Sequence, residues 1–304
     1  MKSRRFSPRK FRPRRNQSIF KKEVTVNVVA LVLVMALCMA IASYLTLKVI
    51  QRDIEREANE EVMVESNLVE HNYDLSRLKW NNHFVTYSDD NYDSILGIDV
   101  SYHQGEIDWK KVKEAGVEFA FIRVGYRGYQ YGVINKDELF DYNIQNAIAN
   151  DIKVGIYFYS QAISTDEARE EVDFVLEQIK DYQIDLPIVF DMEEEGSIGV
   201  GRVKVLVPEE KTKIAVTWMH RIRNAGYEPM YYGSSQLLPQ YFNLENLTEF
   251  PLWLAEYGIR PRYDYDFKIW QYSASGNING IDKVVDLDIL FLPKGETLWG
   301  ISKE

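Results

Sequence analysis

The sequence predicts an α/β protein built as an irregular TIM-like (β/α)5(β)3 barrel, preceded by an N-terminal transmembrane helix. Eight short β-rich runs recur after residue 95, and helical patterns separate the first five of them. Strands that alternate with helices form parallel βαβ units, and eight strands suggest a closed barrel. The last three runs follow one another with little room for helices, which makes the expected barrel irregular.

Each expected strand is a short run rich in β-branched and aromatic residues. The runs are LGIDVS (96–101), FAFIRVG (119–125), KVGIYFYS (153–160), PIVFDME (187–193), PMYYGS (229–234), PLWLAEY (251–257), FKIWQYS (267–273) and VVDLDILF (284–291). The expected helices cover 109–116, 139–150, 165–182 and 208–226, with Thr165 as an N-terminal cap and Gly116 and Gly226 at C-terminal caps.

The first fifty residues have the charge pattern of a membrane anchor. Residues 1–23 hold ten Lys/Arg and one Glu, and residues 24–47 carry no charge. A helix over 24–50 can cross the ~30 Å hydrocarbon core, and the basic flank keeps the N-terminus in the cytoplasm. We therefore expect a basic cytoplasmic tail (1–23), a transmembrane signal-anchor helix (24–50), an extracellular stalk or linker (51–93) and an extracellular barrel (94–304). A cleaved signal peptide, with its site at Ala40-Ile41-Ala42, is the alternative.

Composition argues against several classes of function. The single cysteine, Cys38, allows no internal disulfide, and the four His residues at 71, 83, 103 and 220 stand outside metal-binding spacings. The formal net charge is −10, and membrane topology accounts for the basic residues gathered in 1–23. We therefore expect no metal, no cofactor and no nucleic-acid partner.

The run PIVFDMEEE ends a hydrophobic strand in carboxylates. Residues two apart in a strand face the same side, so Asp191 and Glu193 share one face at the C-terminal end of the fourth strand. Two carboxylates held together do not stabilise a fold, because like charges repel and one pKa rises. A paired Glu that keeps its proton near neutral pH is a general acid. Glu194 and Glu195 are expected to lie in a solvated loop.

Other strand ends carry acids too, and aromatic residues accompany them. The first strand supplies Asp99, and the last supplies Asp286 and Asp288. Flat rings beside carboxylates suit sugars, whose C–H faces stack on aromatic rings. The accompanying aromatic residues are Tyr126, Tyr157, Tyr159, Tyr232, Trp253, Tyr257 and Trp270. All of these except Tyr157 are our candidate substrate-binding residues.

Five segments together resemble a known family. They are GIDVSYHQGEIDWKKVKEAGVEFAFIRVGYRG, ELFDYNIQNAIANDIKVGIYFYSQAISTDEAREEVDFV, LPIVFDMEE, LWLAEY and IWQYSASGNINGIDKVVDLD. In this order and spacing they resemble glycoside hydrolase family 25, the Chalaropsis-type muramidases (lysozymes) of bacteria and phages, over about residues 95–292. The resemblance implies an irregular β/α barrel that cleaves the β-1,4 bond between N-acetylmuramic acid and N-acetylglucosamine in peptidoglycan.

The resemblance also implies roles for the acidic residues. Glu193 would be the general acid, and Asp191 would orient and polarise the 2-acetamido group of the substrate or stabilise the oxocarbenium-like transition state. Asp99 and Asp286 would complete an acidic cluster that tunes pKa values and holds substrate. Retention, with the acetamido group as internal nucleophile, is implied as well, although the carboxyl separation that distinguishes retaining from inverting enzymes cannot be read from a sequence.

This chain departs from the family pattern at two positions. Met192 stands between the paired acids, where the family commonly has Trp, and its side chain is expected to point away from the pair. Glu256, in LAEY, replaces a residue that is commonly neutral or basic, and it is expected to add negative charge near the mouth of the barrel.

The function expected is that of a peptidoglycan muramidase for local cell-wall remodelling. It would be a single-pass protein of a bacterial cell membrane, with glycan strands as substrate and unspecified envelope proteins as further partners. One alternative is a catalytically silent wall-binding module on a membrane stalk. Another is a chitinase-like or glucosaminidase-like hydrolase, although the chitinase pattern DxxDxDxE would require Asp where this chain has Leu186 and Val189.

Overall fold

The computed structural model describes residues 48, 68–194 and 201–296, and the chain divides into two compact units, 1–66 and 67–304. The second unit is described below. The predicted tail, the predicted transmembrane helix apart from Lys48, and residues 51–67 lie outside the described residues. Within the described ranges, no helix has both the length and the apolar character needed to cross a membrane.

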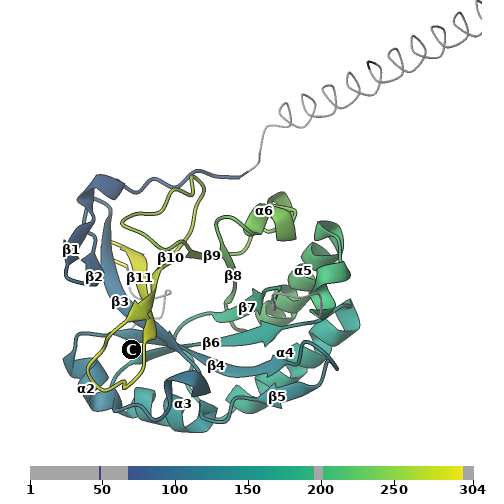
Figure 1. Ribbon diagram of the computed structural model, residues 1–304, viewed down its shortest axis with the longest axis horizontal. Coiled ribbons are helices and arrows are strands. Elements are labelled where there is room, and N and C mark those ends of the chain that lie inside the picture. The colour runs from purple at the N-terminus through teal and green to yellow at the C-terminus, as the bar shows by residue number, and fades with distance from the viewer. Residues whose placement is uncertain (1–47, 49–67, 195–200, 297–304) are drawn as a thin grey trace, which may run out of the picture. The chain divides into compact units, whose positions relative to one another are not determined.

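The second unit is an eight-stranded barrel with one additional edge strand (Figure 1). Hydrogen bonding links the strands in the order β3, β11, β10, β9, β8, β7, β6, β4, and pairing between β3 and β4 closes the ring. Neighbouring strands are parallel except that β11 runs antiparallel to both β10 and β3. The strands are β3 (Tyr92–Val100), β4 (Phe119–Arg127), β6 (Lys153–Ser160), β7 (Ile188–Met192), β8 (Pro229–Ser234), β9 (Leu252–Ala255), β10 (Ile269–Gly276) and β11 (Val285–Pro293), with β5 (Ile134–Lys136) added at the edge of β4.

Helices follow the first five barrel strands and lie outside the sheet (Figure 1). They are α2 (Trp109–Glu114), α3 (Phe140–Ala149), α4 (Thr165–Ile179), α5 (Pro208–Asn224) and the short α6 (Leu238–Tyr241), with 3-10 turns η1 (Leu75–Arg77), η2 (Tyr102–Gln104), η3 (Arg202–Val205) and η4 (Leu244–Asn246). This order confirms the predicted irregular α/β barrel. The N-terminal cap of α4 is Ser164 rather than Thr165, because the Ser164 hydroxyl accepts the backbone N–H of Glu167.

Alternating side chains separate the barrel interior from the outer core. On β7, Ile188, Phe190 and Met192 pack outward against the helices, while Val189 points inward. Phenylalanine rings fill the lower part of the interior, and glycine on neighbouring strands leaves them room. A Cβ on Gly97 would stand 2.1 Å from the ring of Phe119. The C-terminal ends of the parallel strands are thus left as the open end of a filled barrel.

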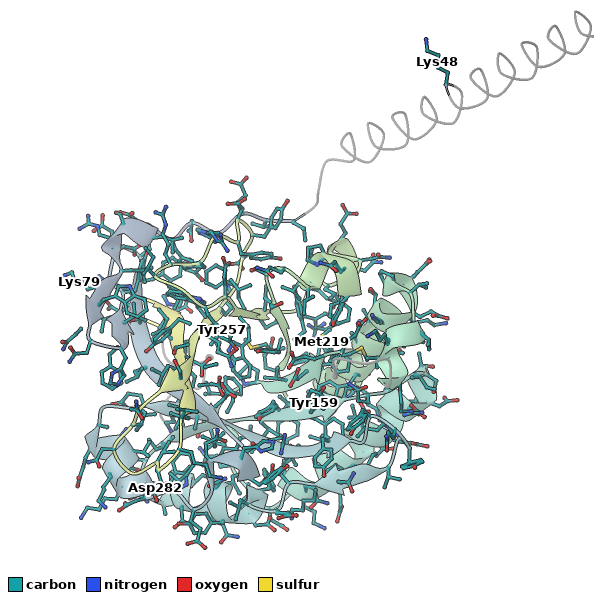
Figure 2. All side chains as sticks on the ribbon, viewed as in Figure 1. Lys48, Lys79, Tyr159, Met219, Tyr257 and Asp282 are labelled. Carbon is teal, nitrogen blue, oxygen red and sulfur yellow. The ribbon has the colours of Figure 1, made fainter. Side chains whose placement is uncertain are left out.

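The N-terminal part of the unit differs from the predicted stalk. Residues 68–93 lie within the second compact unit and carry a hairpin of β1 (Lys79–Asn81) and β2 (Phe84–Thr86), with Lys79 labelled in Figure 2. The Tyr73 hydroxyl donates to the Phe267 carbonyl oxygen at 2.6 Å, and its ring stacks on Phe291 at 4.2 Å. The prediction placed this segment outside the barrel domain because it is polar and irregular, yet Tyr73 and Tyr87 are buried against the outer face of the sheet.

Candidate active site

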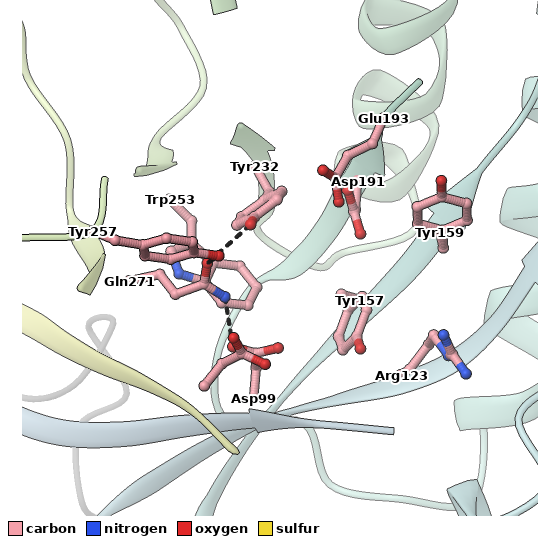
Figure 3. Close-up of a pocket in the computed structure, with 11 residues that line it drawn as sticks. Asp99, Arg123, Tyr157, Tyr159, Asp191, Glu193, Tyr232, Trp253, Tyr257 and Gln271 are labelled. Carbon is pink, nitrogen blue, oxygen red and sulfur yellow. Dashed lines mark hydrogen bonds between the residues drawn. The ribbon is translucent and has the colours of Figure 1, made fainter. Parts of the chain in front are cut away.

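A pocket of about 280 Å³ opens at the C-terminal ends of the barrel strands (Figure 3). This volume lies near the lower end of the usual range for small-ligand sites. The pocket combines acidic and aromatic side chains with one basic residue among those described. Its lining residues are Asp99, Arg123, Tyr157, Tyr159, Asp191, Glu193, Tyr232, Trp253, Tyr257, Gln271 and Asp286.

Two carboxylates reach the pocket from β7. Asp191 and Glu193 point toward the cavity side by side in Figure 3, and Met192 between them is buried in the outer core. The alternation predicted from PIVFDME therefore holds in the structure, and the expected orientation of Met192 is confirmed. Asp191 is 6% exposed, so its carboxylate is largely removed from solvent.

A second group of carboxylates faces the first from β3 and β11. Asp286 pairs with Asp99 across these antiparallel strands, and Asp288 lies two residues further along β11 on the same face. Burial raises the pKa of Asp99 well above its ordinary range, and the charges of Asp286 and Asp288 raise it further. Burial also raises the pKa of Asp288 well above 3.8 and that of Asp286 to about 6. The group therefore retains protons near neutral pH, because ionising all three buried acids would oppose like charges.

Gln271 of β10 connects this acidic cluster to the aromatic wall. Its Nε2 donates to Asp99 Oδ2 at 2.8 Å, and its Oε1 accepts the hydroxyls of Tyr232 at 2.9 Å and Tyr257 at 3.0 Å. Trp253 Nε1 donates to Asp288 Oδ1 at 2.8 Å below them. These bonds fix the orientation of the aromatic side chains relative to the acids (Figure 3).

Four of the six predicted aromatic residues line the pocket, and two do not. Tyr159, Tyr232, Trp253 and Tyr257 are lining residues. Trp253 is only 2% exposed and stacks on Phe121 at 4.6 Å, so it forms part of the pocket floor.

The predicted substrate contact of Trp270 is not supported by its position. Trp270 is fully buried in the outer core, where its Nε1 donates to the Glu256 carbonyl oxygen and its ring meets Trp80. The physical reason is parity, because Gln271 occupies the inward position of β10. Tyr126 does not line the pocket. Its ring centroid lies 5.3 Å from Cζ of the Arg123 guanidinium.

Arg123 and Gln271 are pocket residues that the sequence analysis missed. The Arg123 guanidinium is held by Asp137, with Nε 2.9 Å and Nη2 2.8 Å from Oδ2. Both residues lie at inward positions of their strands, two residues after the inward-facing Phe121 and Ile269. Strand alternation therefore predicts that Arg123 and Gln271 also face the barrel interior. The sequence prediction considered only acidic and aromatic residues as site candidates, and Arg123 and Gln271 are neither.

Glu256 and Glu194 are also placed differently from expectation. Glu256 is buried outside the pocket lining and accepts the backbone N–H and Nε of Arg262 at 3.0 and 2.9 Å. Glu194, expected in a solvated loop, pairs with the buried Lys211 at 2.9 Å. Glu195 lies outside the described residues. Across the described ranges, no group of three His, Cys, Asp or Glu residues could hold a metal ion.

Comparison with known proteins identifies relatives of this barrel. The family model described as Glycosyl hydrolases family 25 matches residues 98–281, more than half of the chain. The autolytic lysozyme of Clostridium acetobutylicum is 28% identical over 193 residues, covering 63% of this chain and 54% of that protein. Lysozyme M1 of Streptomyces globisporus is 27% identical over 201 residues, covering 63% of this chain and 66% of that protein.

Solved structures share the fold. The modular autolysin LytC from Streptococcus pneumoniae, solved in complex with a synthetic peptidoglycan ligand, matches with a TM-score of 0.59 at 25% identity. The match covers 73% of this chain and 52% of LytC, so this chain spans about half the length of LytC, as it does of the Clostridium relative. The extent of the family match, together with these relatives, shows that the chain belongs to family 25 of the glycosyl hydrolases.

Proposed function

We propose that this protein is a peptidoglycan muramidase that hydrolyses the β-1,4 bond between N-acetylmuramic acid and N-acetylglucosamine. The observation that carries the proposal is the placement of Asp191 and Glu193 side by side in an aromatic-walled pocket, opposite the Asp99–Asp286 pair. Glycoside hydrolysis commonly uses a pair of carboxyl groups at the scissile bond, and in substrate-assisted enzymes a group of the substrate itself is the nucleophile. The names of two relatives, both lysozymes, and the peptidoglycan ligand of LytC agree with this substrate.

In the proposed reaction Glu193 gives its proton to the bridging oxygen as the bond to the muramyl anomeric carbon breaks. The carbonyl oxygen of the 2-acetamido group bonds to that carbon from the opposite face, and Asp191 orients the acetamido N–H and stabilises its developing positive charge. Glu193, now a carboxylate, then removes a proton from water as the water oxygen opens the cyclic intermediate. The sugar configuration is retained, and each product gains one part of the water molecule.

The opposite wall holds the sugar rather than reacting with it. Because burial, together with the charges of Asp286 and Asp288, raises the pKa of Asp99 well above its ordinary range, its carboxyl group can donate a hydrogen bond to a sugar oxygen. Asp286, whose pKa burial raises only to about 6, is mostly ionised at pH 7 and can accept one. Tyr159, Tyr232 and Tyr257 supply ring faces along the same cavity. The four acids thereby divide into a reacting pair on β7 and a binding pair on β3 and β11.

We further propose that residues 24–50 anchor the protein in a bacterial cell membrane and that the barrel lies outside the cell. The uncharged run 24–47 and the ten Lys/Arg residues before it support this topology. Tethering would restrict cleavage to wall within reach of the linker, which suits local remodelling. Protease added to intact cells should degrade an epitope on the barrel and spare one on residues 1–23, whereas release of the barrel into the medium would favour the cleaved signal peptide.

The activity is tested with residues 67–304 on purified peptidoglycan, beside Glu193→Gln and the matched control Glu228→Gln. Glu228 is exposed and lies at the start of β8, at the opposite end of the barrel. Products are reduced with borohydride and identified by mass spectrometry. Reduced N-acetylmuramic acid ends from the wild type and the control, and none from Glu193→Gln, are the expected result.

Two other results would redirect the assignment. Reduced N-acetylglucosamine ends would identify a glucosaminidase. Wall binding without cleavage by any form would identify a catalytically silent wall-binding module.

A further inference from the structure

Glu193 stands just beyond the end of the sheet that should position it. The last paired residues of β7 are Met192, opposite Ser160 of β6, and Asp191, opposite Tyr232 of β8. A general acid needs its carboxyl group held within about half an ångström of the reacting oxygen, which a chain leaving a strand does not ensure by itself. Contacts other than the strand ladder therefore have to fix the backbone at this residue.

One such contact comes from the side of β6. Gln161 directly follows the last residue of β6 and is fully buried, and its Nε2 donates to the Glu193 carbonyl oxygen at 2.7 Å. The amide side chain thus ties the backbone of Glu193 to the chain that leaves β6. The backbone carbonyl oxygen of Gln161 accepts a hydrogen bond from Nη1 of Arg202 at 3.1 Å, and Arg202 makes two hydrogen bonds to Glu167, at 3.0 and 2.7 Å.

A second contact holds the chain from the side of α5. Lys211 is 3% exposed, and its Nζ donates to Glu194 Oε1 at 2.9 Å. The same ammonium lies 4.4 Å from the ring centroid of Tyr241, whose hydroxyl accepts the Glu194 backbone N–H at 3.1 Å. A buried lysine is costly unless it is paired, so the ion pair commits Glu194 to this position.

We propose that Gln161 and Lys211 are positioning residues for the acid Glu193, one on each side of it. They hold the backbone beyond the last paired residues of β7 so that the Glu193 carboxyl group enters the pocket beside Asp191. This inference rests on the proposed muramidase function for its kinetic consequence, but the backbone clamp itself can be observed without any reaction. The other acids of the pocket lie on paired strand residues and have no need of such a clamp.

The experiment compares full-length Gln161→Leu and Lys211→Met with matched controls. Gln145→Leu removes an exposed Gln on α3 that bonds the Tyr182 hydroxyl, and Lys213→Met removes an exposed Lys on α5. On a soluble peptidoglycan fragment we expect kcat to fall 10- to 100-fold with KM within twofold of the wild type, and Lys211→Arg to recover most of the loss. Hydrogen exchange at the Glu194 amide should become at least tenfold faster in Gln161→Leu, with both controls unchanged.

The results separate this inference from the function on which it rests. If the wild type cleaves and Glu193→Gln does not, but Gln161→Leu keeps the kcat of its control, the positioning role is wrong. A rise in KM at constant kcat would also overturn it. If the wild type releases no product, the muramidase proposal has failed, and unchanged exchange at the Glu194 amide would then refute the clamp. If Lys211→Met does not fold, the kcat and amide exchange of Gln161→Leu, together with the kcat of Lys211→Arg, test the positioning role without it.

Discussion

Replacing Asp286 by Asn should stabilise the barrel near neutral pH and leave it unchanged in acid. Burial raises the pKa of Asp286 from 3.8 to about 6, so the folded chain holds a proton that the unfolded chain has already released. Stability rises with pH only where the unfolded state binds more protons, and here the folded state binds more. The wild type therefore loses stability as pH rises from about 4 to about 6.

The size of this loss follows from the same two pKa values. At 1.36 kcal/mol per pKa unit, the interval from 3.8 to about 6 corresponds to about 3 kcal/mol of stability lost by the wild type. Asn keeps the shape of the side chain and cannot ionise, so the variant avoids this loss. Its advantage over the wild type should be near zero at pH 4 and approach about 3 kcal/mol at pH 7, as an order of magnitude.

Urea unfolding of residues 67–304 at pH 4, 5, 6 and 7 measures the effect. Asp282→Asn is the matched control, because Asp282 is an exposed carboxylate on the loop before β11 (Figure 2). It should follow the wild type at every pH. A difference between Asp286→Asn and the wild type that stays constant across this range would refute the reasoning, since it would show that Asp286 ionises equally in the folded and unfolded chain. Cleavage by the variant should fall, because the carboxyl group lines the pocket.

Three further changes test the barrel and its pocket. Gly97→Ala puts a methyl group into space filled by the Phe119 ring and should lower the free energy of unfolding by about 1–3 kcal/mol. The control Gly128→Ala, whose new Cβ would have its nearest neighbour 3.6 Å away, should change thermal unfolding much less. Equal effects of the two substitutions would contradict the packing argument. Trp80→Ala removes a hydrogen bond and two ring contacts and should lower the stability of hairpin docking by about 1–2 kcal/mol. The expected readout is faster tryptic cleavage in the β1–β2 hairpin. Unchanged cleavage would show that other contacts hold the hairpin. Gln271→Leu removes the hydrogen bond that lowers the pKa of Asp99 and should therefore raise that pKa further. NMR titration of the Asp99 carboxyl carbon measures the change. A lower pKa in the variant would show that this hydrogen bond does not stabilise the charged form of Asp99.

Much of the barrel could be predicted because strand residues face two different environments. In PIVFDME the outward positions are apolar and pack under helices, and the inward positions turn from Val189 to Asp191 and Glu193 at the mouth. The order of strands and helices then fixes which ends meet. The same logic predicted that Asp99 and Asp286 lie at the mouth, and the structure pairs them across β3 and β11.

The parts that escaped prediction depend on contacts between distant segments. The contact of Trp270 with Trp80, about 190 residues earlier, is one such case, although strand alternation from Ile269 already places Trp270 on the outward face. From the sequence alone, Lys211 is one of several charged residues on a predicted helix, and only the structure shows that it is buried and paired with Glu194. Neither contact has a local sequence pattern, because each joins side chains that only the folded chain brings together.

The antiparallel closing strand has a consequence for synthesis. Asp99 enters the pocket from β3 and Asp286 from β11, and the two are joined only when the final barrel strand inserts beside β3. A chain still emerging from the ribosome already carries Asp99, Asp191 and Glu193, but it lacks Asp286 until β11 has been made. Because domains fold as units and long-range pairing comes late, we expect the complete pocket to form only after nearly the whole barrel has been made.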